Sequence, residues 1–500
     1  MPDLANLAEI LDPAAPDELP FVIELDRNGE ECRRVSWGEA RAEIAALARG
    51  LQGRGLQRGD AVAIVALNSA DYLLVYMATM AAGLVSVPVN HKLPAETVAH
   101  ILADSKIRLA IVDDERAPLI GNRVPQVKLT AIGSLRNPGP FRPLVMKPEE
   151  TAMVLYTSGS TGLPKGVPLS HGGYLWATSM YPDQRAVIEG RPVLIAAPLF
   201  HMNALFSSKN VMRHGGTILL MREFTAPGYI RAIDRYRVSM ITSVPTMLAL
   251  VLREREALAR ADLGCVANVM TGSAPSTAEF FAELQRAFPG AMVWNSWGTT
   301  ESGPIGFGPH PDELPRPAAA LGYPRREVEI KLVGDDPDQG VLFIKTPALM
   351  SGYLNRPQDT ARRLVEGWYD TGDVVRRDEN GFMFFVGRAD DMFLCGGENV
   401  WPGEVEKVLN RHPAVLQAAV VPVPDEIKYQ VPVAFVVPKA GHAATAEEIR
   451  RYTLENGPAY AHPRAVWFLE ALPLAGTNKI DRAALTERAR AQYLRSEARI

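Results

Sequence analysis

The chain has 500 residues, of which 47% are hydrophobic and 22% charged, and its formal net charge at pH 7 is -4. This length exceeds what one hydrophobic core usually holds, so at least two domains are expected. The composition excludes an intrinsically disordered chain. The small negative charge argues against a nucleic-acid partner, because such a partner calls for a broad basic surface.

Cysteine usage and the N-terminal sequence both favour a cytoplasmic protein. Cys32, Cys265 and Cys395 lie far apart without C-x-x-C spacing, so neither a disulfide framework nor a zinc site is expected. The N-terminal sequence is acidic and lacks the basic and apolar regions of a signal peptide. The longest apolar run, residues 72–89, is interrupted by a glycine and a proline, which favours a buried helix and a strand over a membrane span. The sequence leaves a homodimer open.

The N-terminal part alternates between apolar strands and amphipathic helices. Residues 21–25 and 31–35 flank an Asn-Gly turn and predict a hairpin, and Ser36 with Glu39 predicts a capping box that opens a helix. Further strands are expected at residues 61–65, 85–89, 109–112, 152–155, 192–197, 217–220, 240–243, 265–271 and 293–295. Further helices are expected in the segment after residue 72 and at residues 98–105, 227–236 and 246–258. This alternation predicts an α/β fold with parallel, doubly wound sheets.

The pattern changes beyond residue 321. Residues 328–332 and 340–345 alternate with period two and predict an antiparallel β region, to which residues 382–386 add a strand. A smaller α+β pattern follows, with helices at residues 402–409, 446–452 and the C-terminus, and strands at residues 417–421 and 433–437. We therefore expect a large N-terminal domain, residues 1–388, and a small α+β C-terminal domain, residues 389–500.

The segment from 156 to 167, Y-T-S-G-S-T-G-L-P-K-G-V, has the composition of a polyphosphate-binding loop. A buried strand precedes it, and its glycines let backbone N–H groups turn toward an anion. Its hydroxyls add donors, and Lys165 adds a positive charge. The spacing is not that of a Walker loop. The alternative is a flexible glycine- and serine-rich linker.

This segment resembles the phosphate loop of the adenylate-forming superfamily, which includes acyl- and aryl-CoA synthetases, peptide-synthetase adenylation domains and firefly-type luciferases. Four further motifs follow in the order found in that superfamily: A-P-L-F-H ending at His201, T-G-S-A-P ending at Pro275, N-S-W-G-T-T-E ending at Glu301, and W-Y-D-T-G-D ending at Asp373. The resemblance extends from about residue 20 to about residue 482. It implies a mobile C-terminal domain.

The resemblance also implies how ATP is bound. The loop would hold the phosphates, the T-G-S-A-P turn would lie against the adenine, and Trp297, where the superfamily usually has tyrosine, would offer a stacking face. Asp373 and Arg388 would bind the ribose hydroxyls. The expected nucleotide-binding residues are Thr157, Ser158, Gly159, Ser160, Thr161, Gly162, Lys165, Gly272, Ser273, Ala274, Pro275, Asn295, Ser296, Trp297, Gly298, Thr299, Thr300, Glu301, Asp373, Arg388 and Lys479.

The catalytic residues implied by the resemblance are Lys479, Glu301, Thr161 and Lys165. Glu301 and Thr161 would also hold Mg²⁺, which prefers few protein ligands together with substrate phosphates. Lys479 lies in T-N-K-I, which matches the segment of the catalytic lysine although the superfamily often has glycine before that lysine.

The small domain would carry the hinge and part of the CoA site. Asp390 matches the hinge residue, and Gly396, Gly397 and His462 would contact CoA. His462 lies where the superfamily often has a Y-K-x-P sequence, so a frequent lysine is missing here.

The expected acid pocket contains His201, Met202, Asn203, Ser243, Ser273, Gly298 and Ser302. In the superfamily the matching histidine borders the carboxylate substrate. Met202 is adaptable, and Asn203 could bind either a substrate hydroxyl or the backbone. These segments contain no clear arginine that would indicate an acid with a second carboxylate. We therefore expect a monocarboxylic aromatic or medium-length aliphatic acid.

The implied function is an acyl- or aryl-CoA synthetase that uses ATP, Mg²⁺ and CoA, adenylates a carboxylic acid and then forms its thioester. One alternative is an adenylating enzyme whose acceptor is a carrier-protein thiol or an amine. Another is a non-catalytic nucleotide-binding homologue, against which the intact motifs argue. A luciferase-type oxygenase is a third alternative that no residue favours.

Overall fold

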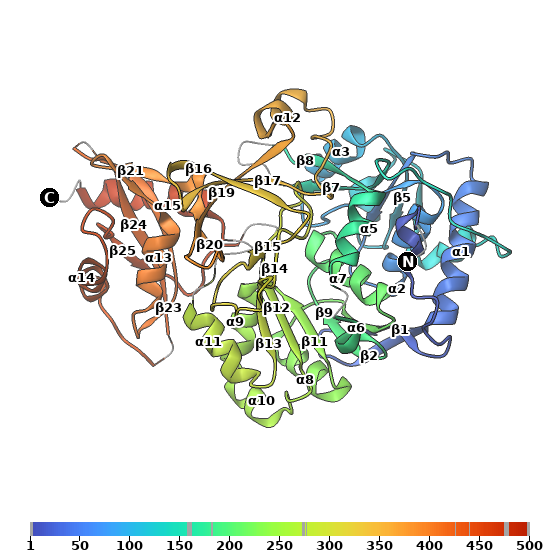
Figure 1. Ribbon diagram of the computed structural model, residues 1–500, viewed down its shortest axis with the longest axis horizontal. Coiled ribbons are helices and arrows are strands. Elements are labelled where there is room, and N and C mark those ends of the chain that lie inside the picture. The colour runs from blue at the N-terminus through green and yellow to red at the C-terminus, as the bar shows by residue number, and fades with distance from the viewer. Residues whose placement is uncertain are drawn as a thin grey trace.

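Two parallel sheets, an antiparallel region and a smaller C-terminal sheet make up the fold (Figure 1). The computed structural model describes residues 4–157, 163–181, 184–272, 276, 278–425, 427–439, 441–474 and 480–497. The elements of the C-terminal part, from β21 to α15, gather at one end of the molecule, and α1 lies at the other end.

The first parallel sheet has seven strands in the order β13-β12-β11-β9-β10-β1-β2. Its strands are β1 (Pro20–Leu25), β2 (Glu31–Ser36), β9 (Pro192–Ile195), β10 (Thr217–Met221), β11 (Met240–Ser243), β12 (Asn268–Gly272) and β13 (Met292–Ser296). All neighbouring pairs are parallel except β1 and β2, which form the predicted hairpin.

The second sheet has six strands in the order β6-β5-β3-β4-β7-β8. Its strands are β3 (Ala61–Val65), β4 (Val85–Pro88), β5 (Ile107–Val112), β6 (Gln126–Lys128), β7 (Thr151–Thr157) and β8 (Lys165–Ser170). Only β8 runs antiparallel to its neighbour, β7. The phosphate-loop segment therefore joins an antiparallel pair and is not followed by a helix.

Helices cover both faces of the two sheets. The helices are α1 (Trp37–Gly53), α2 (Ala70–Ala81), α3 (Ala95–Asp104), α4 (Ala117–Ile120), α5 (His171–Ser179), α6 (Arg185–Ile188), α7 (Met202–Arg213), α8 (Ala226–Tyr236), α9 (Pro245–Arg253), α10 (Arg255–Arg260), α11 (Ala278–Ala287), α12 (Pro357–Arg363), α13 (Pro402–Asn410), α14 (Ala446–Asn456) and α15 (Arg482–Glu497). The 3-10 helices are η1 (Leu7–Ile10), η2 (Leu129–Leu135) and η4 (Ala389–Asp391).

The alternation of side chains along β3 shows how the layers form. Val62 and Ile64 pack in a core shared with α1, α2, α5 and α7, which lie between the two sheets. Their neighbours Ala61, Ala63 and Val65 pack on the opposite face against α3. Successive strand residues point to opposite faces, so a strand covered on both sides is apolar throughout. The far face of the seven-stranded sheet packs against α8, α9 and α11.

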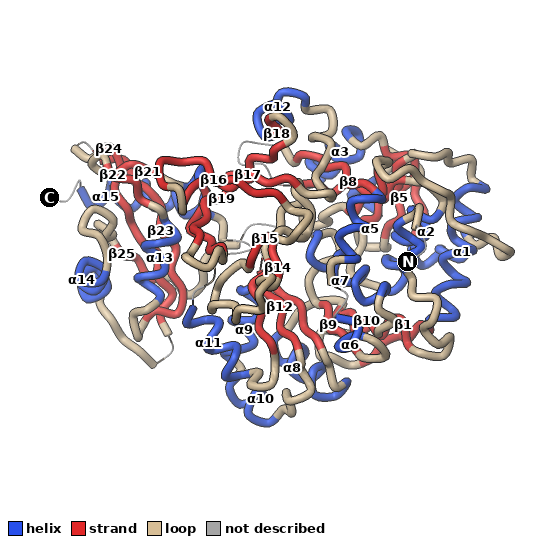
Figure 2. Tube along the Cα trace, in the orientation of Figure 1, coloured by secondary structure: helices blue, strands red, loops and turns tan. Residues whose placement is uncertain are grey.

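The predicted antiparallel region is present. It consists of β16 (Glu329–Asp336), β17 (Gln339–Lys345), β18 (Leu364–Val365), β19 (Trp368–Arg377) and β20 (Met383–Arg388), with a separate pair, β14 (Phe307–Gly308) and β15 (Tyr323–Pro324). The C-terminal sheet contains β21 (Phe393–Cys395), β22 (Glu398–Val400), β23 (Val415–Asp425), β24 (Tyr429–Pro438) and β25 (Val466–Phe468). This sheet has its own apolar core with α13, α14 and α15. Figure 2 shows the strands of the C-terminal sheet at the left end of the molecule.

One predicted helix is wrong in its extent. Residues 246–258 form two helices, α9 and α10, because Glu254 leaves the helical region with φ -79 and ψ 56. The second helix, α10, buries no residue. Its Ala257 and Leu258 are only partly buried, and they pack against the same apolar core as α9. Within the described ranges, no helix combines the length and the apolar composition needed to cross a membrane.

His171 fastens the N-terminal segment to the layer between the sheets. Its side chain is fully buried at the start of α5, and its Nδ1 accepts a hydrogen bond of 2.9 Å from the backbone N–H of Leu7. Burial lowers the pKa of His171 to about 4. Protonation of Nδ1 would both charge a buried ring and remove the acceptor.

The pH dependence of stability should therefore include a histidine component. An unfolded histidine titrates near pH 6.5. Between about pH 6.5 and about pH 4, His171 is therefore protonated in the unfolded chain but neutral in the folded chain. The free energy of unfolding should fall as the pH falls through this window, by at most about 1.4 kcal/mol per pH unit for this residue. Chemical denaturation of His171→Gln, which keeps an acceptor without a titrating ring, should show a shallower fall. An unchanged slope would contradict this account.

Candidate active site

The predicted phosphate-loop and metal segments meet where β7 ends. The hydroxyl of Thr157, the last residue of β7, lies 3.5 Å from Oε1 of Glu301, at a separation of 144 residues in the chain. Glu301 follows β13, which belongs to the other parallel sheet. The site is thus assembled from the two sheets together.

Tyr353 joins Glu301 to Lys165. Its hydroxyl donates a 3.0 Å hydrogen bond to Oε1 of Glu301, and Nζ of Lys165 lies 5.1 Å from the centre of its ring. Lys165 also forms an ion pair with Asp359 of α12 at 3.3 Å. Burial, and after it the charge of Glu301, raise the pKa of Tyr353, so the phenol stays protonated as a donor. The sequence motifs gave no sign of Tyr353, because it lies in a loop outside all of them.

Glu301 has the chemistry of a magnesium ligand. Both hydroxyls bond to Oε1, and a carboxylate has about four acceptor directions on two oxygens. Among the described residues, no group of three or more histidine, cysteine or acidic side chains lies together as a metal cluster. A single carboxylate fits Mg²⁺, which takes most of its ligands from water and phosphate. The second expected ligand, Thr161, lies outside the described residues.

Asp373 is held by two donors from different segments. The indole Nε1–H of Trp297 donates to Oδ2 at 2.8 Å, and Nη1 of Arg388 donates to Oδ1 at 2.5 Å. Asp373 lies in β19, and only 6% of its surface is exposed. Arg388 ends β20, opposite Asp373 in the antiparallel register. Asp373 and Arg388, which were both expected at the ribose, therefore form a pair. Trp297 adds a hydrogen bond from its ring N–H, a group that tyrosine lacks.

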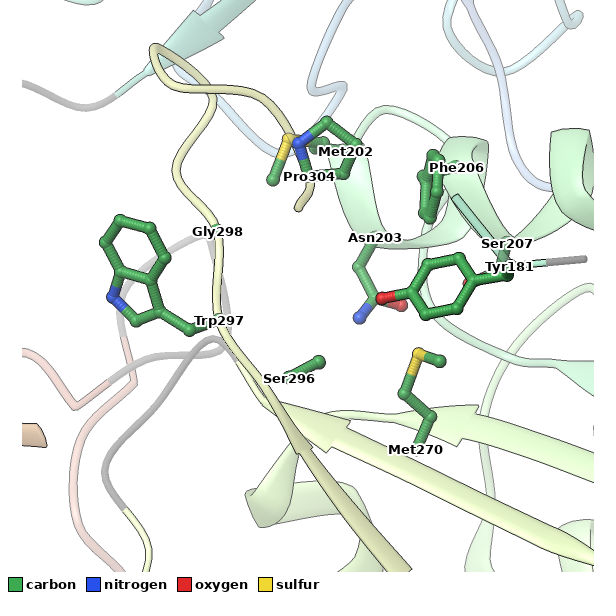
Figure 3. Close-up of a pocket in the computed structure, with 10 residues that line it drawn as sticks. All are labelled: Tyr181, Met202, Asn203, Phe206, Ser207, Met270, Ser296, Trp297, Gly298 and Pro304. Atoms are coloured by element: carbon green, nitrogen blue, oxygen red, sulfur yellow. The ribbon is translucent and has the colours of Figure 1, made fainter. Parts of the chain in front are cut away.

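The ring of Trp297 is fixed by packing. It makes an edge contact with Phe307, with the ring centres 5.4 Å apart. A Cβ atom at Gly306 would come within 2.9 Å of the indole, so this glycine permits the close approach. Figure 3 shows the indole on the opposite side of its own chain from Asn203 and Tyr181. The residues 296–298 therefore separate the side of the Trp297 indole and Asp373 from the side of Asn203 and Tyr181.

The pocket has an apolar lining with a polar patch on α7. It is lined by Tyr181, Met202, Asn203, Phe206, Ser207, Met270, Ser296, Trp297, Gly298 and Pro304 (Figure 3). Met202, Asn203 and Gly298 were expected there. Phe206 and Ser207 were missed, although they follow Met202 and Asn203 at the four-residue spacing that places side chains on one helical face.

Asn203 takes part in a chain of hydrogen bonds. The hydroxyl of Ser207 donates to that of Thr242 at 3.1 Å, and Thr242 donates to Oδ1 of Asn203 at 3.2 Å. With its carbonyl oxygen engaged, Asn203 presents its amide N–H₂ as a donor. In Figure 3 this nitrogen points into the space between Trp297 and Tyr181.

The other expected acid-pocket residues that the structure describes, His201, Ser243 and Ser302, do not line this cavity. His201 directly precedes α7. Ser243 is fully buried at the end of β11, and the Ser302 hydroxyl lies 2.9 Å from that of Thr299 within a turn. Their contact with an acid stays a prediction. Ser158, Gly159, Ser160, Thr161, Gly162, Ser273, Ala274, Pro275 and Lys479 lie outside the described residues.

Several expected nucleotide contacts shape the backbone around β13. Asn295 donates to the carbonyl of Ala319, and Ser296 donates to that of Thr271. A Cβ atom at Gly272 would lie 2.1 Å from the carbonyl oxygen of Ser296, so only glycine fits between the strand ends. Within the described ranges, no hydrogen bond of the Thr300 side chain contributes to this arrangement, and its role stays a prediction.

Arg363 of α12 connects β19 to the expected hinge. It donates to Asp370 at 3.1 Å and to Asp390, in η4, at 3.0 Å. Arg388 lies 3.5 Å from the same Asp390 carboxylate. Gly396 and Gly397 form the turn between β21 and β22 with φ of 62 and 89. His462 lies beside Arg464, whose Nη1 is 2.7 Å from its Nε2.

Comparison with known proteins places the chain in a family. It matches the AMP-binding enzyme family over residues 14–354 and the AMP-binding enzyme C-terminal domain over residues 404–479. The chain belongs to the AMP-binding enzyme family, and the resemblance to the adenylate-forming superfamily is confirmed.

Three relatives are informative. The chain is 31% identical to a feruloyl-CoA synthase of Amycolatopsis sp, over 89% of this chain and 92% of that protein. It is 29% identical to 4-coumarate–CoA ligase 3 of Arabidopsis thaliana, over 91% of this chain and 87% of that protein. Its structure resembles that of the o-succinylbenzoate CoA synthetase of Bacillus subtilis in complex with its acyl-adenylate, with a TM-score of 0.84, 27% identity, and coverage of 96% of this chain and 98% of the other.

Replacing Trp297 with phenylalanine distinguishes the role of its N–H from the role of its aromatic face. Trp297→Phe keeps a stacking ring but removes one of the two donors to Asp373. A hydrogen bond to a charged group is worth about 1.5 kcal/mol or more, so KM for ATP should rise roughly tenfold. Steady-state kinetics at saturating acid would measure this. Trp294→Phe is the matched control, because its N–H bonds to Asn268 and should not affect KM for ATP. Equal KM values for Trp297→Phe and the unaltered protein would refute the role of the N–H.

Proposed function

We propose that this protein is an AMP-forming acid–thiol ligase that joins an aromatic monocarboxylic acid to CoA at the expense of ATP. The observation that carries the proposal is the segment 296–298. One side of this segment lines the acid pocket, and on its other side the Trp297 indole binds the buried carboxylate of Asp373. An acid in the pocket and a nucleotide at Asp373 would therefore meet across this segment.

The binding roles follow from the contacts. Asp373 and Arg388 would take the ribose hydroxyls, and the open face of Trp297 would take the adenine. The segment from Thr157 to Lys165 would hold the phosphates. Lys165 is already oriented by Asp359 and Tyr353. A fixed charge needs no reorganisation when negative charge builds up on the phosphates.

The reaction would proceed in two steps. A carboxylate oxygen of the acid attacks the α-phosphorus of ATP, the bond from that phosphorus to the bridging oxygen breaks, and pyrophosphate leaves. The sulfur of CoA then attacks the acyl carbon, AMP leaves with the carboxylate oxygen, and the thiol proton passes to solvent. Neither step needs a nucleophile from the protein, so catalysis rests on positioning and electrostatics. Mg²⁺, held by Glu301 and Thr161, would neutralise charge on the phosphates.

The pocket favours an aromatic acid with a polar substituent. Phe206, Tyr181 and two methionines give it a wide apolar lining, while the Asn203 amide offers a donor. The similarity to proteins named feruloyl-CoA synthase and 4-coumarate–CoA ligase supports a hydroxylated cinnamic acid.

The small domain, residues 389–500, would rotate about Asp390 between the two steps. Lys479 would serve adenylation, and Gly396, Gly397 and His462 would serve the CoA step. A cytoplasmic location, the lack of a nucleic-acid partner and the oligomeric state stay predictions.

A screen of acids tests the function directly. Pyrophosphate exchange into ATP, measured without CoA, should occur with hydroxycinnamic acids and should be weaker with octanoic acid. Addition of CoA should then convert the same acid to its thioester. Exchange without thioester, together with product from an added amine or carrier-protein thiol, would favour the alternative acceptors. Absence of exchange with every acid would refute the proposal.

Asn203 should determine the preference for acids with a polar substituent. Asn203→Leu keeps the size of the side chain but removes the donor, so the ratio of kcat/KM for 4-coumarate to that for cinnamate should fall roughly fivefold, as expected for the loss of about 1 kcal/mol. Met202→Leu, an apolar change in the same lining, should leave the ratio unchanged. The idea fails if Asn203→Leu keeps the preference of the unaltered protein.

Asp390→Pro should uncouple the two half-reactions. Proline fixes φ and removes a backbone donor, so it should hinder rotation at this residue. We expect thioester formation from supplied acyl-adenylate to fall far more than pyrophosphate exchange. Asp390→Ala is the control, because it removes the ion pairs with Arg363 and Arg388 but leaves the backbone free. A parallel fall in both steps would show that Asp390 only links the domains.

A further inference from the structure

Tyr181 forms one wall of the pocket and is packed from two directions. Its ring centre lies 6.3 Å from that of Phe206, which lines the same pocket. The guanidinium of Arg325, which does not itself line the pocket, lies 4.6 Å from the centre of the Tyr181 ring. In Figure 3 the Tyr181 hydroxyl points toward the space beside the Asn203 amide. The phenol is therefore placed in the pocket by an aromatic neighbour and a cation.

Arg325 is brought to this wall by the β14–β15 pair. It directly follows β15, and its backbone N–H donates a 3.3 Å hydrogen bond to the carbonyl of Gly306. A Cβ atom at Gly308, in β14, would come within 2.9 Å of the Cζ of Arg325, so glycine permits the guanidinium to lie this close to the strand. The position of the guanidinium is thus set by backbone contacts on the side of Tyr181 away from the pocket lining.

The positive charge beside Tyr181 is not matched by a carboxylate. Among the described residues, the buried Nε of Arg325 has no hydrogen-bond partner. A second guanidinium nearby, that of Arg316, donates to the backbone carbonyls of Ala320 and Asn295. Burial, and with it the charge of Arg325, lowers the pKa of Arg316 to about 10, so Arg316 still carries its charge at neutral pH. This wall of the pocket is therefore electropositive.

The polar groups at this wall are suited to donate hydrogen bonds. Arginine has donors and no acceptor. The carbonyl oxygen of Asn203 accepts from Thr242, so its amide N–H₂ remains as a donor. A cation over an aromatic face is attracted by the electrons of the ring and draws them toward itself, which makes the hydroxyl of Tyr181 a stronger donor. A substituent with an acceptor oxygen complements these groups, whereas an amino substituent would set donor against donor.

We propose that Tyr181 is a specificity-determining residue that donates a hydrogen bond to an oxygen on the ring of the acid, and that Arg325 is the positioning residue that orients and polarises its phenol. This inference rests on the proposed function and deepens it by naming the class of acid. The ring of the acid carries a hydroxyl or methoxy group and not an amino group.

The test compares acids that differ in one substituent. The measured quantity is the ratio of kcat/KM for 4-methoxycinnamate to that for cinnamate in pyrophosphate exchange. Tyr181→Phe keeps the ring and removes the hydroxyl, so this ratio should fall roughly fivefold, as expected for the loss of one hydrogen bond. The ratio for 4-aminocinnamate to cinnamate should not fall. Both acids are measured on one preparation, so a loss of folded protein lowers both rates equally and leaves the ratio unchanged.

Arg325 is tested with the same ratio. Arg325→Met removes the cation and keeps an apolar side chain over the Tyr181 ring, so the ratio for 4-methoxycinnamate should fall roughly threefold, as expected for one cation–π contact. Arg325→Lys keeps the charge and should retain most of the ratio. Arg326→Met is the matched control, because the neighbouring Arg326 is exposed, and its ratio should equal that of the unaltered protein.

Two outcomes overturn the inference while the proposed function stands. One is an unchanged ratio in Tyr181→Phe, and the other is a fall in Tyr181→Phe without any fall in Arg325→Met. Isothermal titration calorimetry with the same two acids gives a ratio of dissociation constants that does not depend on turnover. If the unaltered protein catalyses no exchange, the proposed function fails. Calorimetry then still supports the inference if Tyr181→Phe weakens binding of 4-methoxycinnamate alone, and overturns it if the variant binds both acids as the unaltered protein does or if neither acid binds.

Discussion

The buried carboxylate of Asp373 is the point through which the rest of the site is joined. It accepts hydrogen bonds from Trp297, which follows the last strand of the seven-stranded sheet, and from Arg388, which ends the antiparallel region. Loss of Arg388 would leave this buried carboxylate with an uncompensated charge, and loss of the Trp297 N–H would remove a hydrogen-bond donor from it; both are costly. This one group therefore fixes the ring of Trp297, one wall of the pocket, and Arg388, the last residue before η4. A nucleotide ribose that bound Asp373 would therefore affect the positions of all three.

The location of the site follows from the two parallel sheets. Loops at the carboxyl ends of parallel strands gather at one edge, where ligands of open α/β sheets bind. Here the two sheets share one layer of helices, so the end of β7 in one sheet meets the segment after β13 of the other, and Thr157 contacts Glu301. Tyr353 then connects this pair to Lys165. The positions of Lys165 and Glu301, the residues proposed to bind phosphate and metal, are thereby set by the packing of the sheets.

Much of this arrangement could be predicted from the sequence, because it depends on local patterns. Three elements depend only on the residues within them: the capping box of Ser36, the Asn-Gly hairpin and the apolar strand β3. The motifs likewise predicted Glu301, Asp373 and Arg388 as parts of one site, which stays a prediction. The sequence did not reveal Tyr353, Phe206 or the N–H contact of Trp297, because each depends on segments that only the fold brings together. The break at Glu254 was missed because the helical propensity of residues 246–258 continues across it, while only the first half contains buried residues.

The central claim is that an acyl-adenylate lies between the acid and its thioester. It can be tested by supplying an acid with a heavy-oxygen label in both carboxylate positions, together with ATP and CoA, and analysing the nucleotide product by mass spectrometry. Attack of the carboxylate on the α-phosphorus transfers a single labelled oxygen to AMP, and the thioester keeps the other label. The account predicts AMP with that single label and unlabelled pyrophosphate. Unlabelled AMP, or ADP as the nucleotide product, would contradict it.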